Sequence, residues 1–344
     1  MGDLVQTLPA LTDAARAIPD IRFDWVVDES FSQVPAWHPR VEKVFPSAFR
    51  RWNKNWLRSL KSREPQEFLK QLRRRKYDLI VDLQGEFKSA LAARLARGPR
   101  CGYDARAAHE WGAHFLYQKK IFVPKGIHSI QRMRQSLSQA LDYEYDPDQV
   151  DYGIEPSSLG PPPPSLPEPY FVFVHSTSWP SKVWPEHYWR TLIETATATG
   201  FSVVLPWGDQ AERQRALRIA AGHKDAVVLP PLSISEKAAI IARAQATVGL
   251  DTGLSHIAAA FAVPSVTLYG ATDPLLVGAT GKKQVHLTSE FECIKCHETV
   301  CSYQKPAEFK PACFVEITPG RVWQALQKLL TTKYDETQKV LARV

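Results

Sequence analysis

The sequence predicts an α/β protein with two Rossmann-like domains, each built on a parallel sheet, and three observations carry this prediction. Short apolar runs alternate with amphipathic segments, which is the pattern of a parallel sheet covered by helices on both faces. Residues 159–167 contain five prolines, so they can form neither a helix nor a central strand and separate two such regions. The length of 344 residues is comfortable for two hydrophobic cores.

Residues 1–158 form the first predicted domain. Two short apolar runs, 23–27 and 77–82, predict buried parallel strands because each lies beside segments with helical spacing. Helices are expected at 4–15, 65–76 and 88–97.

Residues 159–168 form a predicted linker, and residues 169–319 form the second domain, where the alternation is more regular. Its strands are expected at 170–174, 201–205, 226–229, 246–249 and 265–269, and its helices at 185–199, 209–222, 235–244 and 254–261. Residues 320–344 are assigned to a last helix, near 320–330, and a tail. In such folds ligands bind at the carboxyl ends of the strands, so we look for chemistry in the loops there.

Composition and charge narrow the class of protein. A hydrophobic content of 44% and a charged content of 23% are ordinary for a globular protein, which argues against disorder. No stretch has the length and apolarity of a membrane span, and the first residues lack the pattern of a signal peptide. A cytosolic protein is therefore the simplest expectation.

The net charge of +7 comes entirely from the first half, where residues 1–150 hold 25 Lys and Arg against 18 Asp and Glu. Most of the excess lies in residues 50–76, which contain 11 basic residues and two acidic ones. Two interpretations stay open. The segment is either a solvated helix face or a surface for a polyanion, such as nucleic acid, anionic lipid headgroups or a phosphorylated substrate.

The loop after the predicted strand 170–174 has the character of an anion site. Small hydroxyl residues, including Thr177 and Ser178, precede a helix, and Lys182 adds a positive charge. In the next loop Glu212 follows the glycine turn at Gly208. Its carboxylate can accept hydrogen bonds from ribose hydroxyls, or it is simply a glutamate favoured at a helix N-terminus.

The loop after strand 246–249 is the most specific of the three. Thr252 and Gly253 place free backbone amides at the start of a helix, Gly253 allows close approach of a phosphate, and His256 lies one turn later. A carboxylate beside a phosphate is costly, so we expect Asp251 to bind sugar hydroxyls; a plain N-cap role for Asp251 is the alternative. Together the three loops predict a site for a nucleotide diphosphate with an attached sugar. The absence of a Walker lysine motif or G-x-G-x-x-G argues against an NTPase or a dehydrogenase.

Several motifs taken together are specific, although each alone is weak. They are Gly2-Asp3 with Leu8-Pro9-Ala10, Pro206-Trp207-Gly208 with Glu212, residues 251–256, and residues 269–274. This combination resembles the lipopolysaccharide heptosyltransferases of glycosyltransferase family 9, over nearly the whole chain except the cysteine-bearing insert near residues 290–315. Residues 23–27, Trp37-His38 and 50–52 resemble the members whose acceptor is the Kdo sugar of lipid A.

The resemblance implies the GT-B fold, with an N-terminal acceptor domain facing a C-terminal donor domain. It implies inverting, metal-independent transfer of L-glycero-D-manno-heptose from ADP-heptose, without a cofactor. Asp3 would be the general base, and Lys182 would neutralise the departing ADP. The implied donor-binding residues are Thr177, Ser178, Lys182, Glu212, Asp251, Thr252, Gly253 and His256. Ser178 stands where a threonine is expected, and the hydroxyl is kept.

The resemblance also gives the basic first half a partner. Kdo-lipid A carries phosphates and carboxylates and lies at the inner membrane, so peripheral attachment to the anionic cytoplasmic face is expected. The implied acceptor-side residues are Arg50, Arg51, Lys54, His128, Arg132 and Arg134. Two alternatives remain: a paralogous heptosyltransferase with a different core acceptor, and a nucleic-acid-binding protein. The second would leave the Asp251–His256 loop without a purpose, so no nucleic acid is expected.

Four of the five cysteines, Cys293, Cys296, Cys301 and Cys313, lie in one insert. The C-x-x-C spacing has zinc-site character, but the second pair is irregularly spaced. Reduced thiols, a structural metal and disulfides all stay open, and no catalytic role is expected.

The resemblance also bears on the first residues. Relatives place a central strand and a short Ser-rich turn before the Met-Gly-Asp motif, so we expect that about ten residues are absent and that the first strand of the N-terminal domain is missing.

Overall fold

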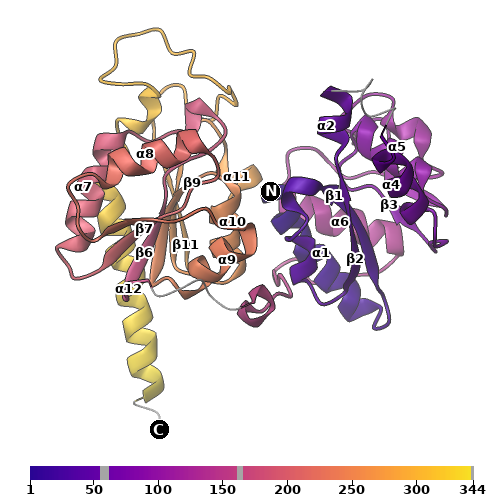
Figure 1. Cartoon of the computed structure of the whole chain (residues 1–344), viewed down its shortest axis with the longest axis horizontal. Coiled ribbons are helices and arrows are strands. Elements are labelled where there is room, and N and C mark those ends of the chain that lie inside the picture. The colour runs from indigo at the N-terminus through magenta and orange to yellow at the C-terminus, as the bar shows by residue number, and fades with distance from the viewer. Residues whose placement is uncertain (55–61, 161–165, 342–344) are drawn as a thin grey trace. The chain divides into compact units, whose positions relative to one another are not determined.

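The computed structural model describes residues 1–54, 62–160 and 166–341. The described chain divides into two compact units (Figure 1). The N-terminal unit is Asp3–Ile154, and the C-terminal unit is Glu155–Val344 together with Met1–Gly2. Part of the predicted linker, 161–165, and part of the basic segment, 55–61, lie outside the described residues.

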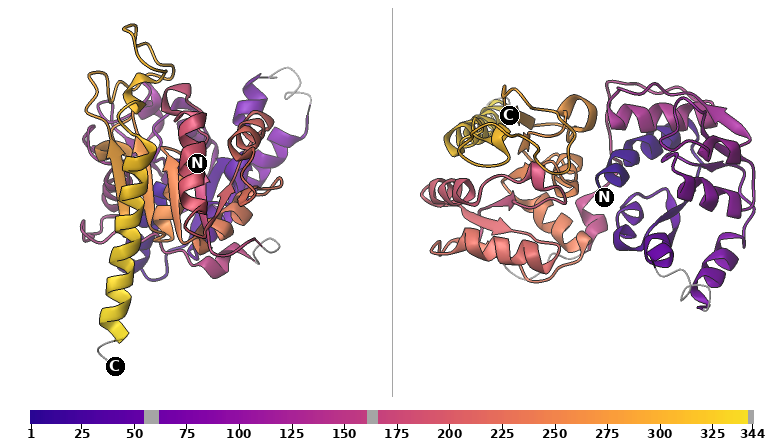
Figure 2. Two further views of the ribbon diagram at one scale, coloured as in Figure 1. Left: turned by 90° about the vertical axis from the view of Figure 1, so that its left-hand side faces the viewer. Right: turned by 90° about the horizontal axis from the view of Figure 1, so that it is seen from above.

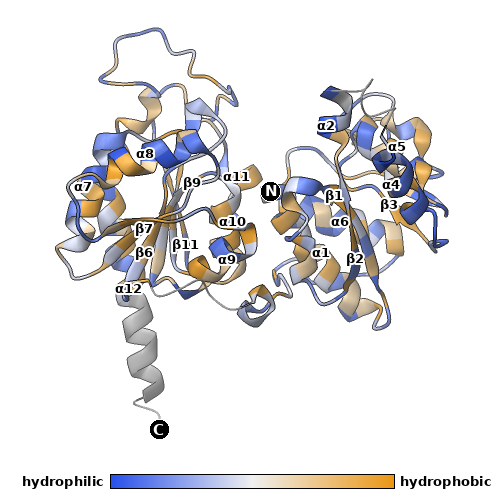
Figure 3. Cartoon of the chain, viewed as in Figure 1, coloured by the Kyte–Doolittle hydropathy of each residue, from blue (hydrophilic) through white to orange (hydrophobic). Residues whose placement is uncertain are grey.

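The C-terminal unit is built on one six-stranded parallel sheet with the order β11-β10-β9-β6-β7-β8. The strands are β6 (Tyr170–Val174), β7 (Ser202–Leu205), β8 (Ala226–Val228), β9 (Ala246–Leu250), β10 (Ser265–Tyr269) and β11 (Gln284–Thr288). Every residue of β6, β9 and β10 is buried, and β6 in particular is largely apolar (Figure 3), as expected for a strand covered on both faces.

Helices cover this sheet: α7 (Glu186–Thr197), α8 (Gln210–Ala220), α9 (Ile234–Arg243), α10 (Gly253–Ala260), α11 (Pro274–Val277) and α12 (Pro319–Leu341). The fully buried indoles of Trp184 and Trp189 lie in the core that α7 shares with the sheet. α12 packs against α7 and β10, runs along its own unit, and continues beyond it (Figure 2).

The N-terminal unit contains helices α1 (Gly2–Ala17), α2 (Phe49–Lys54), α4 (Glu64–Leu72), α5 (Phe87–Leu95) and α6 (Ser129–Leu141). Its strands are β1 (Phe23–Asp28), β2 (Val41–Ser47), β3 (Ile80–Val81), β4 (Arg100–Tyr103) and β5 (Lys119–Ile121). They form two separate parallel sheets, β1-β2 and β3-β4-β5. No ladder joins β1 to β3 within the described residues, although Trp25 of β1 and Val81 of β3 pack against the same core of α1 and α6.

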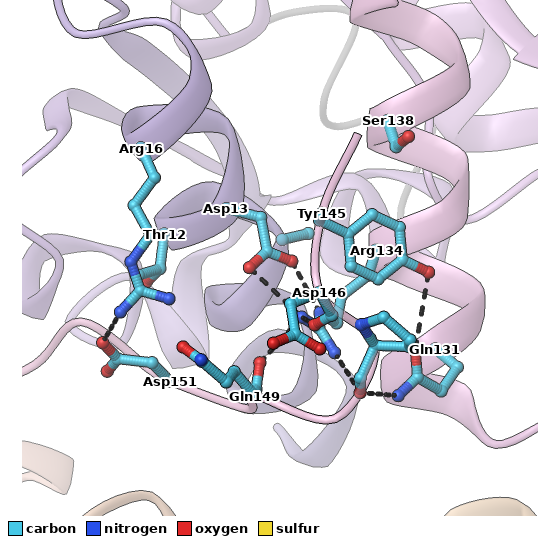
Figure 4. A network of polar contacts seen from close by, with 12 residues as sticks. Thr12, Asp13, Arg16, Gln131, Arg134, Ser138, Tyr145, Asp146, Gln149 and Asp151 are labelled. Carbon is cyan, nitrogen blue, oxygen red and sulfur yellow. Dashed lines mark hydrogen bonds and ion pairs between the residues drawn. The ribbon is translucent and has the colours of Figure 1, made fainter. Parts of the chain in front are cut away.

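A buried ion pair joins α6 to α1 in this unit (Figure 4). The guanidinium of Arg134 is fully buried and donates to the Asp13 carboxylate at 2.6 and 3.2 Å. It also donates to the carbonyl oxygens of Asp146 at 2.6 Å and Gln149 at 2.7 Å. Arg134 therefore fixes the segment after α6 onto α1, as a buried charge must have several partners to be tolerated.

Two predicted elements have different lengths in the structure. The run 77–82 forms only the two-residue strand β3, because just Ile80 and Val81 pair with β4. The helix predicted at 65–76 ends at Leu72, before four consecutive basic residues whose charges repel one another in a helical turn. Among the helices of the described segments, none is long and apolar enough to cross a membrane.

Candidate functional site

The carboxyl ends of β6, β9 and β10 bring three side chains together around one carboxylate. Asp251, directly after β9, is 7% exposed. Its Oδ2 lies 2.7 Å from Lys182 Nζ and accepts a hydrogen bond from Thr272 Oγ1 at 2.7 Å. The adjacent carboxylate oxygen lies 3.9 Å from His256 Nε2. The site therefore holds a cation, a carboxylate and a hydroxyl in fixed positions.

Lys182 is positioned by the short 3₁₀ helix η5 (Pro180–Lys182). Its ammonium lies 4.2 Å from the centre of the Trp179 ring as well as beside Asp251, and its side chain is 13% exposed. A positive charge in such a partly buried position is screened less by water than one at the surface, so it can stabilise negative charge on a ligand.

The loop after β9 opens α10 as the sequence predicts. The N-cap residue is Thr252, so the alternative of Asp251 as a plain N-cap is wrong. Gly249 is needed for the packing beneath this loop: an added Cβ would lie close to the Ser255 hydroxyl, which donates to Leu250 O at 2.7 Å. The first amides of α10, including that of Gly253, lack partners within the helix and are suited to an anion.

The loop after β6 contributes hydroxyl groups next to the same carboxylate. Thr177 Oγ1 donates to the backbone carbonyl of Asp251 at 3.3 Å, and Ser178 is exposed. His175 is fully buried, and burial lowers its pKa to about 3, so its imidazole is neutral. His175 is therefore an uncharged, buried part of this loop.

Glu212 lies in the first turn of α8, whose N-cap is Asp209. Its carboxylate accepts a hydrogen bond from the Gly208 amide at 2.5 Å, and its own amide donates to Asp209 Oδ1 at 2.9 Å. This geometry fits both sequence interpretations, the ribose acceptor and the helix-terminal glutamate, so the ribose role stays a prediction.

The predicted acceptor residues fall into exposed and buried groups. Arg50 is largely exposed with Asp28 Oδ2 at 3.4 Å, and Lys54 is exposed. Arg51 donates to both Glu29 and Glu64 at 2.6–3.0 Å, and these hydrogen bonds raise the pKa of its guanidinium.

The other three predicted acceptor residues have roles within the fold. His128 is the N-cap of α6 and accepts from the Ile130 amide at 3.2 Å. Arg132 is 8% exposed and donates to Ala107 O at 2.5 Å. Arg134 is fully buried in the ion pair described above, so we correct its assignment from acceptor contact to structural support.

Asp3, the predicted base, is exposed in the first turn of α1, and its carbonyl accepts from Thr7 Oγ1 at 2.7 Å. An acidic residue is favoured in this turn by the helix dipole. Its catalytic role stays a prediction.

The cysteine insert is fastened to two loops of the site. Ser181 donates its amide to Thr299 O, and the amides of Lys295 and His297 donate to Gly270 O and Ala271 O, both at 2.8 Å. Four thiols, those of Cys293, Cys296, Cys301 and Cys313, line one cavity of about 390 Å³. No disulfide links them, and no group of three His, Cys, Asp or Glu in the described residues is arranged to hold a metal ion.

Sequence reasoning did not assign Thr272 or Trp179 to the site. Thr272 lies within the motif at 269–274, which the sequence analysis identified, but the sequence does not show that Thr272 contacts Asp251. No sequence motif points to Trp179, and only its place between Ser178 and Lys182 associates it with the site.

Comparison with known proteins decides what kind of site this is. The family model "Glycosyltransferase family 9 (heptosyltransferase)" matches residues 66–307. Lipopolysaccharide heptosyltransferase 1 of Pseudomonas aeruginosa is 45% identical over 340 residues, covering 96% of this chain and 95% of that protein. The chain belongs to glycosyltransferase family 9. The resemblance stated from the sequence motifs is confirmed, and this member of the family is a glycosyltransferase enzyme.

Solved heptosyltransferases have the same α/β fold with parallel sheets. The structure of the Escherichia coli heptosyltransferase WaaC with ADP superposes with a TM-score of 0.84 at 38% identity, covering 96% of this chain and 97% of that chain. WaaC with ADP-2-deoxy-2-fluoro heptose gives a TM-score of 0.81 at 37% identity, covering 95% and 96%. Both of these structures hold a nucleotide ligand, ADP or ADP-2-deoxy-2-fluoro heptose, on the fold described above.

Proposed function

We propose that this heptosyltransferase transfers L-glycero-D-manno-heptose from ADP-heptose to the Kdo sugar of Kdo-lipid A, in lipopolysaccharide inner-core biosynthesis. The observation that carries the proposal is the cluster of Lys182, Asp251 and Thr272 beside the N-terminus of α10. Its chemistry suits a sugar joined to a diphosphate, and the similarity to a heptosyltransferase structure with ADP supports the donor.

Each site residue has a role in the proposed donor complex. The amides of Thr252 and Gly253, with Thr177, Ser178 and His256, bind the diphosphate. Glu212 accepts from the ribose hydroxyls, and Asp251 accepts from hydroxyls of the heptose. These donor contacts use groups that the described structure already holds at the carboxyl ends of β6, β7 and β9.

The reaction is proposed as an inverting, single displacement. A Kdo hydroxyl attacks the anomeric carbon of the heptose, Asp3 accepts the hydroxyl proton, and the bond to the ADP oxygen breaks. Lys182 is the cation that stabilises the negative charge on the departing ADP. Because Asp251 lies 2.7 Å from Lys182 Nζ, it also positions this ammonium.

On the acceptor side, Arg50, Arg51 and Lys54 remain the proposed contacts for the acidic groups of Kdo-lipid A. Their exposure supports this role, whereas the burial of Arg132 and Arg134 does not. The enzyme is proposed to work at the cytoplasmic face of the inner membrane.

We also propose the GT-B arrangement for this chain, in which each unit is a Rossmann-like domain. The C-terminal unit supports this from within the molecule, because its central strand β6 lies between β7-β8 and β9-β10-β11. The described strands of the N-terminal unit are also all parallel, in the sheets β1-β2 and β3-β4-β5.

The test is transfer of heptose from ADP-heptose to Kdo-lipid A, followed by mass spectrometry. Lys182→Ala is expected to lower kcat at least about a hundredfold, as removal of a group that stabilises transition-state charge does. Lys305→Ala is the matched control, because Lys305 also forms a 2.7 Å ion pair, with Glu292, but on the surface.

Asp3→Ala is expected to lower kcat by about a hundredfold or more, with ADP-induced thermal stabilisation unchanged. Near-full activity of Asp3→Ala would refute the base assignment. Transfer to a core acceptor other than Kdo, with none to Kdo-lipid A, would favour a paralogous activity. DNA binding without stabilisation by ADP would overturn the proposal as a whole.

A further inference from the structure

Large apolar side chains are exposed on one part of the N-terminal unit. Phe87 and Leu91 of α5 are 53% and 41% exposed, Trp111 is 84% exposed, and Phe115 is 66% exposed. We call these four residues the α5–η3 patch, since Phe115 belongs to the 3₁₀ helix η3 (Ala113–Leu116). Exposed aromatic side chains gathered in one place are uncommon on a protein that has no partner for them.

The four side chains come from elements that pack against each other. Phe87 and Leu91 are four residues apart and lie on the same face of α5. The rings of Trp111 and Phe115 are in edge contact with centroids 5.9 Å apart. The Glu110 carboxylate, next to Trp111, accepts from the Phe87 amide at 2.6 Å, and α5 contacts η3 along its length.

The patch lies on the two connections that join the strands of the β3-β4-β5 sheet. Phe87 follows β3 by a short turn, and the segment with Trp111 and Phe115 follows β4. Because β4 and β5 are parallel, this segment leaves the carboxyl end of β4 and returns to the amino end of β5, where Leu116 O accepts from Arg100, the first residue of β4. Phe122, directly after β5, is 43% exposed and lies under the guanidinium of Arg106 at 4.2 Å.

The segment that carries the patch has a surplus of positive charge, which favours an anionic partner. Residues 85–125 contain eight Lys and Arg and three Asp and Glu, a surplus of five positive charges. Lys119, Lys120 and Lys125 are exposed. Tryptophan and phenylalanine beside basic residues are the composition of surfaces that enter the headgroup region of a bilayer. Each nearby Lys or Arg adds on the order of 1 kcal/mol of attraction to anionic lipid.

We propose that the α5–η3 patch is the surface by which this enzyme docks on an anionic phospholipid bilayer. The attachment then depends on side chains of α5 and of the β4–β5 connection, in addition to the basic residues of the segment 50–76. The inference rests on the proposed function in one respect, that the acceptor is a lipid. The bilayer, and not a second copy of the chain, is the partner because the surplus of like charge opposes self-association.

The test is flotation of the full chain with vesicles of phosphatidylglycerol and phosphatidylcholine, compared with phosphatidylcholine alone. The double variant Trp111→Ser/Phe115→Ser is expected to lose at least tenfold in affinity for the anionic vesicles. Leu91→Ser is expected to lose several-fold, whereas Leu217→Ser, which removes an equally exposed leucine from α8 of the C-terminal unit, is expected to lose nothing. Equal thermal stability of all variants shows that they are folded.

Unchanged vesicle binding by the double variant would overturn the inference, as would equal binding of the wild type to uncharged vesicles. A wild-type dimer that the double variant abolishes, with vesicle binding retained, would assign the patch to self-association and also overturn it. Heptose transfer to a deacylated, water-soluble Kdo acceptor tests the proposed function separately. The double variant is expected to retain this activity, since the patch contacts the bilayer and not the reacting sugar.

Discussion

The two units of this chain use the same kind of sequence to build sheets of different completeness. The apolar runs 23–27 and 170–174 both predict buried parallel strands, and both are strands in the structure. Yet all five residues of β6 are buried, whereas only Val27 is buried among the six residues of β1. β6 has a neighbour on each side, β7 and β9, whereas β1 pairs only with β2 among the described strands.

The difference shows that burial of a parallel strand is decided by its neighbours and not by its own composition. A central strand is covered on both faces by helices and on both edges by other strands. In the N-terminal unit, β1 and β3 each leave one edge without a ladder in the described structure. We therefore expect the stability of the two sheets to differ in ways that can be measured.

The largest expected difference is in hydrogen exchange. β6 and β9 each pair with a strand on both sides, so their amides are expected to exchange only when the C-terminal unit opens as a whole. Amides of β3, and those of β1 that do not bond to β2, are expected to exchange at least about a hundredfold faster. Exchange measured by NMR or mass spectrometry checks this, and equal protection of β1 and β6 would contradict the comparison.

A matched pair of substitutions is expected to have a smaller effect. Val172 of β6 is fully buried, whereas Val26 of β1 is half-buried. Val172→Ala is expected to lower the free energy of unfolding by about 2 kcal/mol, through lost burial and the cavity left behind, and Val26→Ala by about 1 kcal/mol or less. Urea unfolding of both variants measures the difference. A larger loss for Val26→Ala would mean that β1 is better covered than its exposure indicates.

The effect expected to be smallest for each pH unit is on the pH dependence of stability. In each unit a buried histidine is neutral because burial lowers its pKa, to about 4 for His38 and to about 3 for His175. Below the ordinary histidine pKa of about 6.5, the unfolded chain binds a proton that the folded chain does not. Stability is therefore full above that pH and falls on acidification, by up to about 1.4 kcal/mol per pH unit for each histidine.

The fall is expected to end near pH 4 for His38 and near pH 3 for His175. His38→Gln and His175→Gln should each flatten the slope of unfolding free energy between about pH 6.5 and pH 5, measured by urea titration. A slope that both variants share with the wild type would exclude these two histidines as its source.

The sequence predicted the C-terminal unit better than the N-terminal one, for a physical reason. Buried strands such as β6, β9 and β10 are short segments rich in apolar residues, and each was expected within a residue of its observed bounds. β4 contains a glycine and begins with Arg100, and β5 contains two lysines, so neither has the apolar pattern of a buried strand. Their pairing comes from tertiary structure, which overrides local preference.

The candidate site was likewise predicted only in part. Lys182, Asp251 and His256 were predicted because each follows a strand or opens a helix in a recognisable motif. The burial of Arg134 could not be predicted, because its partners Asp13, Asp146 and Gln149 lie 12 to 121 residues away in the sequence. A basic residue on a helix is usually solvated, and only the fold shows that this one is enclosed.

The backbone bonds from the cysteine insert to Gly270 and Ala271 make the insert a convenient place to observe the site. Of the five cysteines, all in the described part of the chain, Cys296 alone is exposed. A thiol-reactive dye would therefore attach there first, next to His297, whose amide bonds to the loop that carries Thr272. The native sequence thus supplies a labelling position at Cys296, one residue from His297, which bonds to the loop that carries Thr272. Fluorescence there can follow ligand binding without an engineered cysteine.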